Sequence, residues 1–351
     1  MKLQHPFPPS LAKFFSTMLT ISLLFVSGQA VLLYGVLAGL LIIGAFLSAF
    51  LLIIPVLFLF NAKKLPDFSI LNVLKLICFL ESLTINFLIV FLIFSSIEAD
   101  PLPLFFLAIF PFFLILFLFV KKKNEGIATV KMSLLVALAI FLPNYIFLQE
   151  GLETVYHNLL NYYPSTLHLE QNGAGKLFFL LIGTFFSKLL AQMPNLNEYV
   201  EGHFWKGVRK LFIGVFIWAT NILAFSTMTL VTFTYIKPQA SENMVFFIML
   251  ENQVGDIFVA AILLLICLCS VIEIFRSIQM LGENRSCWNF LWVLPALTMA
   301  VYFYFSKIEI IRIFILFGIT MTIISVVYFV TFIIHHKFVQ KAKFNINIIS
   351  K

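Results

Sequence analysis

Charged side chains are scarce in this sequence. Only 11% of the 351 residues are Asp, Glu, Lys or Arg, and 62% are hydrophobic, whereas soluble domains carry about 25% charged residues. This composition excludes an ordinary soluble domain. Because a lipid-embedded backbone must satisfy its own hydrogen bonds, the chain is predicted to be an all-α polytopic membrane protein, organised as one transmembrane domain over residues 1–351.

The sequence also lacks the usual motifs of enzymes and metal sites. It has four cysteines, and no histidine accompanies the close pair Cys267 and Cys269. Neither a disulfide framework nor a zinc site is therefore expected. There is no phosphate-binding glycine loop and no plausible nucleophile triad. We expect no enzyme activity and no cofactor. The alternative of a membrane enzyme acting on lipid-linked substrates has one candidate site, the acids and histidine between Glu198 and His203.

Apolar runs of about 20 residues, long enough to span a bilayer, predict ten transmembrane helices. Their approximate ranges are 14–34, 37–60, 70–95, 102–120, 131–148, 176–195, 211–236, 256–280, 288–305 and 312–336.

The formal net charge is +7, which could suggest nucleic acid as a partner. Most lysines and arginines instead fall in loops that an even number of spans places on one side, Lys131 among them. This bias indicates membrane orientation. The sequence therefore predicts a multi-pass protein of the cell membrane with both termini in the cytoplasm. Asn197 to Lys210 mixes charges with aromatic residues, which is typical of a segment at the headgroups of the membrane lipid.

The spans divide into two sets of five, 14–148 and 176–336. Five is an odd number, so the second set enters the membrane from the opposite side, as in an inverted repeat. The first span of each set carries a polar interruption. These are Ser27, Gly28 and Gln29 in helix one, and Gly183 and Thr184 in helix six. Paired interruptions predict broken helices that bind substrate near the membrane midplane.

Two charges lie deep within predicted spans. Lys188 is about 11 Å from the inner end of its span, and Glu81 is about 16 Å from the inner surface. A buried charge normally has a partner, so we expect these two side chains to pair. The pair either couples an ion or proton to function or is only structural. Glu273 is a third candidate for ion or proton coupling, although Arg276, three residues on, would share its helix face as a local partner.

Several stretches are similar to those of a known family. They are DPLPLFFLAIF (100–110), KKKNEGIATVK (121–131), NLLNYYP (158–164) and FWKGVRKLFIGV (204–215). Together with the ten spans, they resemble the endospore germination permeases, the B subunits of germinant receptors in the amino acid–polyamine–organocation superfamily. Members usually have a glycine-rich break in helix one followed by a proline, where this chain has only Ser27 and Gly28.

The resemblance implies an amino-acid-permease-like fold with broken helices one and six. It places a small solute, such as an amino acid, among helices one, three, six and eight. Those helices carry the candidates named above: Ser27, Gly28, Gln29, Glu81, Gly183, Thr184, Lys188 and Glu273. The implied partners are the germinant receptor A and C subunits, and the implied location is the spore inner membrane. A non-transporting structural subunit is the remaining alternative.

Overall fold

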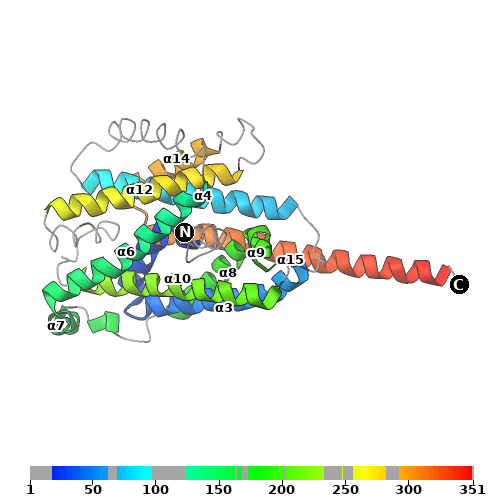
Figure 1. Cartoon of the computed structure of the whole chain (residues 1–351), viewed down its shortest axis with the longest axis horizontal. Helices are drawn as coiled ribbons and strands as arrows, with labels where there is room; N and C mark the ends of the chain where they lie inside the picture. Colours follow the sequence, from blue (N-terminus) through cyan, green and yellow to red (C-terminus); the bar gives the residue numbers. More distant parts are fainter. Residues whose placement is uncertain are drawn as a thin grey trace, which may run out of the picture.

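The computed structural model describes residues 18–61, 69–96, 124–162, 164–167, 173–200, 203–232, 247, 256–281 and 292–349. All regular elements in these ranges are helices (Figure 1). They are α2 (Ile21–Tyr34), α3 (Ala38–Asn61), α4 (Ser69–Ser96), α6 (Asn124–Glu150), α7 (Leu152–Tyr162), the 3-10 helix η1 (Pro164–Leu167), α8 (Ala174–Ala191), α9 (Met193–Val200), α10 (Phe204–Thr232), α12 (Asp256–Leu281), α14 (Val293–Phe305) and α15 (Ile310–Ile349).

Five of the described helices are long and apolar enough to cross a membrane: α3, α4, α8, α10 and α15. Shorter apolar helices cover Ile21–Tyr34, Lys131–Tyr145, Ala261–Ile274 and Val293–Phe305. The all-helical class is therefore confirmed for the described residues, and the five long apolar helices support a membrane-embedded protein. The predicted span at 102–120 lies outside the described residues, and the count of ten stays a prediction.

Helix α4 is the most enclosed of the candidate spans and contacts α2, α8, α12, α14 and α15. Of its most apolar window 72% is buried, against 33% for α15. A helix that is apolar around its whole circumference is expected to be enclosed by other helices. Three polar residues in the inner part of α4, Glu81, Thr84 and Asn86, are buried against protein, whereas Asn72 and Lys75 near its start are exposed.

The helix breaks predicted at Gly28 and at Gly183–Thr184 are wrong, because α2 and α8 run through these residues without interruption. The glycines serve close helix packing instead. A Cβ on Gly28 would lie 2.8 Å from Oγ1 of Thr229 on α10, and one on Gly183 would lie 2.7 Å from Oγ1 of Thr322 on α15. Small residues let membrane helices approach closely, and that is the role the structure gives to both.

Regular helical geometry is interrupted at two other places. Leu19 and Thr20 leave helical geometry just before α2, with Thr20 extended at φ −104° and ψ 152°. A second interruption is at Gln192, where α8 ends and α9 begins. Each predicted repeat thus departs from regular helix near its first segment, although not at its glycine, and at Gln192 the departure is small, because Gln192 N–H still donates to the Lys188 carbonyl at 3.2 Å.

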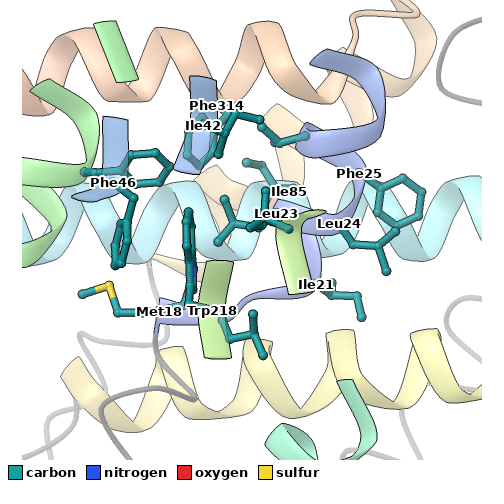
Figure 2. Close-up of a cluster of buried hydrophobic side chains, with 14 of the residues drawn as sticks. Met18, Ile21, Leu23, Leu24, Phe25, Ile42, Phe46, Ile85, Trp218 and Phe314 are labelled. Atoms are coloured by element: carbon teal, nitrogen blue, oxygen red, sulfur yellow. The ribbon is translucent and has the colours of Figure 1, made fainter. Parts of the chain in front are cut away.

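Aromatic packing holds the first interruption in place (Figure 2). Trp218 of α10 stacks on Phe46 of α3 with ring centroids 3.9 Å apart, and the edge of Phe185 from α8 packs against it at 5.5 Å. The indole N–H of Trp218 donates to the backbone carbonyl of Met18 at 3.2 Å. A buried indole needs such an acceptor, and the carbonyl needs a donor because the helix is broken there.

The packing of α8 on α15 gives a first prediction. We expect Gly183→Ala to lower the free energy of unfolding by about 1–3 kcal/mol, the usual cost of overpacking. The new methyl group would meet both Oγ1 and Cγ2 of Thr322, at 2.7 and 2.8 Å, so rotating the threonine does not relieve the clash. Gly175→Ala is the matched control on α8, because no heavy atom lies within 4 Å of its Cβ position. Unfolding of the purified protein by SDS titration measures both. Equal stability of the two variants would contradict the close packing.

Candidate functional site: buried charges at the interruption before α2

Glu273 of α12 is the centre of a buried polar cluster. Its Oε1 accepts a hydrogen bond from the backbone N–H of Ile21 at 2.7 Å and lies 2.8 Å from Nζ of Lys131 on α6. Its Oε2 accepts from Nδ2 of Asn86 on α4 at 3.1 Å. The Glu273 and Lys131 side chains are only 3% and 1% exposed. One carboxylate thus joins α2, α4, α6 and α12 inside the bundle.

The start of α2 explains why a carboxylate is stable there. The first N–H groups of a helix have no partner within the helix, and the aligned peptide dipoles favour negative charge at that end. Thr20 does not cap α2, since its side chain makes no capping hydrogen bond and lies 2.7 Å from the hydroxyl of Ser22. Glu273 supplies the missing acceptor from another helix. The interruption and the acid therefore stabilise each other.

The position expected for Lys131 from the sequence is wrong. This residue was expected in an inner loop before the fifth span, but α6 begins at Asn124 and carries Lys131 into the protein. The expected local partner of Glu273 was Arg276, whose side chain lies outside the described ones. The carboxylate binds Lys131 instead. The sequence indicated only that Glu273 needs a cation at a similar depth in the membrane. It did not indicate which helix supplies that cation.

The expected pairing of Glu81 and Lys188 is confirmed. Nζ of Lys188 lies 2.7 Å from Oε1 of Glu81, which links α8 to α4. The lysine ammonium also lies 4.1 Å from the ring centroid of Phe314 on α15, a cation–π contact. Glu81 is 3% exposed and Lys188 is 20% exposed. The lysine end of this pair is therefore the accessible one.

Polar contacts along α4 connect the two ion pairs. Ser82, next to Glu81, has its hydroxyl 3.0 Å from that of Ser277 on α12. Asn86, one turn further, donates to the Ser82 carbonyl at 2.7 Å as well as to Glu273. The two pairs thus lie at either end of one short polar run between α4 and α12.

The five residues predicted to bind substrate lie in helix contacts. Ser27 is buried and donates to the Leu24 carbonyl at 2.9 Å, and Gly28 faces Thr229. The side-chain oxygen of Gln29 accepts from the Ile311 N–H at 2.8 Å, at the start of α15.

On α8, Gly183 faces Thr322, and Thr184 donates to the Leu180 carbonyl at 2.8 Å while packing against Gly318. The structure brings none of the five together with Glu81, Lys188 or Glu273 by a hydrogen bond among the described residues. Their role in binding stays a prediction.

The structure adds no residue to the candidate enzyme site between Glu198 and His203 in the described part of the chain. His203 is exposed at the start of α10, and the side chain of Glu198 lies outside the described ones. Within the described ranges, no group of three or more His, Cys, Asp or Glu side chains could hold a metal ion.

Comparisons with known proteins give this chain no relative: no family model, no curated protein and no solved structure matches it. The site must therefore be interpreted from its own chemistry. It holds a carboxylate, an ammonium and an amide around a helix start. The amide oxygen Oδ1 of Asn86 is buried and has no hydrogen-bond partner in the described part of the protein. An unpaired buried acceptor costs about 1–3 kcal/mol, so the cluster favours an additional hydrogen-bond donor.

Proposed function

We propose that the chain is a permease-like membrane protein that binds a small amphipathic solute, such as an amino acid, at the interruption before α2. The observation that carries the proposal is the contact of Glu273 with Ile21 N–H and Lys131 at this interruption. Discontinuous helices and charges buried inside a bundle are the usual parts of a transporter site. The chain then either transports the solute or reports its presence to partner subunits.

Helix packing supports the proposed ten-span inverted repeat. Moving five helices along the chain maps α2, α3, α4 and α6 onto α8, α10, α12 and α15, and the predicted span at 102–120 onto α14. Under this mapping the α3–α8 contact corresponds to α10–α2, and α4–α15 corresponds to α12–α6; all four contacts occur. The α3–α10 and α4–α12 contacts map onto themselves. Two extensive contacts do not fit the mapping: the packing of α8 on α15 has no equal between α2 and α6, and that of α6 on α10 has no equal between α15 and α3, in the described residues.

The interruption suggests how binding would act on the protein. The carbonyl of Met18 is held by Trp218 on α10, and the N–H of Ile21 is held by Glu273 on α12. Side chains from two other helices thus replace the missing helical hydrogen bonds. A solute that donates both to Asn86 Oδ1 and to the Glu273 carboxylate would compete with Ile21 N–H and Lys131 for that carboxylate and alter these contacts. Such a solute shifts an inward–outward equilibrium if its affinities for the two states differ.

The resemblance to germination permeases extends this proposal to a partner complex. In that setting the chain would be the germinant-sensing or transport subunit beside the A and C subunits, in the spore inner membrane, with both termini in the cytoplasm. The Glu81–Lys188 and Lys131–Glu273 pairs would couple an ion or proton to the conformational change.

Uptake by reconstituted protein tests the proposal. Proteoliposomes with an imposed pH gradient are given radiolabelled amino acids, and protein-free liposomes are the control. We expect uptake above the control that is lost in Glu273→Gln. Binding without uptake, seen as a solute-dependent rise in unfolding temperature, would indicate a sensor.

A structural subunit is the second candidate function. Each of the two buried pairs matches one acid with one lysine, so these charges are compensated without any solute. Absence of both uptake and solute-dependent stabilisation would favour this candidate over the permease.

A further inference from the structure

The inner end of α10 carries cations on a surface that faces lipid. Trp205, Arg209, Ile213 and Phe216 follow one another at intervals of four, four and three residues, so they form one stripe. Trp205 is 73%, Ile213 55% and Phe216 66% exposed. Exposed apolar side chains in the middle of a membrane helix contact acyl chains. Arg209 lies one turn beyond Ile213, about 6 Å further along the axis, which is where hydrocarbon gives way to headgroups.

Lys206 and Lys210 flank this stripe, and all three cations are exposed. None of the three has an ion-pair or hydrogen-bond partner among the described residues. Three unpaired cations within two turns attract anionic headgroups, at about 1 kcal/mol for each Lys or Arg near the surface. The surface therefore has an electrostatic preference that the apolar stripe alone would not give.

The neighbouring apolar surface fits the rest of a lipid. Phe58 of α3 is 53% exposed and packs edge-to-face against Phe204, with ring centroids 5.3 Å apart. Phe204 packs in the same way against Trp205 at 5.3 Å. Phe58, Phe204 and Trp205 thus form an aromatic surface next to the cations, which an acyl chain can contact.

We propose that Trp205, Lys206, Arg209 and Lys210, the α10 surface, bind the headgroup of an anionic phospholipid. The three cations contact the phosphate, Trp205 lies beside them at headgroup level, and the acyl chains follow Ile213 and Phe216. The occupant is a lipid rather than a free phosphate, because the cations continue a surface already in contact with hydrocarbon. This proposal does not depend on the solute site.

Fluorescence quenching tests the α10 surface. The full chain in detergent micelles is titrated with brominated phosphatidylglycerol or brominated phosphatidylcholine, and the Trp205 signal is the difference between the wild type and Trp205→Phe. We expect phosphatidylglycerol to quench at lower concentration. The preference should fall about fivefold for each cation removed, in Arg209→Gln and in the triple variant with Lys206→Gln and Lys210→Gln.

Lys176→Gln is the matched control, because Lys176 is an exposed lysine near the start of α8, about 22 Å from the end of α8 that leads into α9. It should leave the preference unchanged. Equal quenching by the two lipids in the wild type, or an unchanged preference in Arg209→Gln, would overturn the proposal. Competition by glycerol 1-phosphate would also overturn it, since the surface would then bind soluble phosphate.

Discussion

Replacing Lys131 with methionine is expected to lower the free energy of unfolding by about 3–5 kcal/mol, the cost of breaking a buried ion pair. Methionine keeps the length of the side chain but leaves the Glu273 carboxylate, which is 3% exposed, with only neutral donors from Ile21 and Asn86. We also expect the backbone before α2 to become more mobile, because the Ile21 N–H and the Lys131 ammonium both contact Oε1 of Glu273. The measurement is an SDS unfolding titration of purified protein.

The variants around this pair separate charge from packing. Lys176→Met makes the same chemical change at an exposed lysine and should alter stability by no more than about 0.5 kcal/mol. The double variant Lys131→Met with Glu273→Gln should recover most of the loss, since a neutral amide can still accept from Ile21. Wild-type stability in Lys131→Met would mean that the pair contributes nothing to the fold.

The helices themselves were predictable because a membrane leaves little choice. An apolar run must form its own backbone hydrogen bonds, so the spans expected at 37–60 and 70–95 match α3 and α4 within one residue at each end. The Glu81–Lys188 pair was predictable for a related reason. Two lone charges at similar depth have few alternatives to each other.

The helix interruptions were not predictable from local sequence. Glycine has two uses in a membrane helix, a break or a close contact, and the choice depends on the facing residue. For Gly28 and Gly183 that residue is Thr229 or Thr322, far away in the chain. The interruption at Leu19–Thr20 contains no glycine at all. Its determinants, Trp218 and Glu273, come from α10 and α12. Lys131 escaped notice because it borders an apolar run whose helix extends seven residues further toward the N-terminus.

The Glu81–Lys188 pair should respond unequally to its two single substitutions. We expect Lys188→Met to cost about 3 kcal/mol of folding free energy, because it leaves the Glu81 carboxylate buried without a cation. Glu81→Gln should cost roughly half as much. Lys188 is 20% exposed and keeps its contact with the Phe314 ring at 4.1 Å, so its charge remains partly solvated. SDS unfolding of the purified variants measures both changes.

Adding Phe314→Leu to Glu81→Gln should remove this advantage and bring the loss close to that of Lys188→Met. Equal losses in the two single variants, whatever residue occupies position 314, would show that the ring does not support the ammonium.

The double variant Lys188→Met with Glu81→Gln decides between a structural and a coupling role for the pair. In either case its stability should recover toward the wild type, because no buried charge is left unpaired. If the pair serves coupling, the stable double variant still fails in solute uptake or in the solute-dependent rise of unfolding temperature. Recovery of both stability and response would make the pair structural only. Additive losses of stability would mean that Glu81 and Lys188 do not interact in the folded protein, and that the Lys188 ammonium is stabilised by another partner.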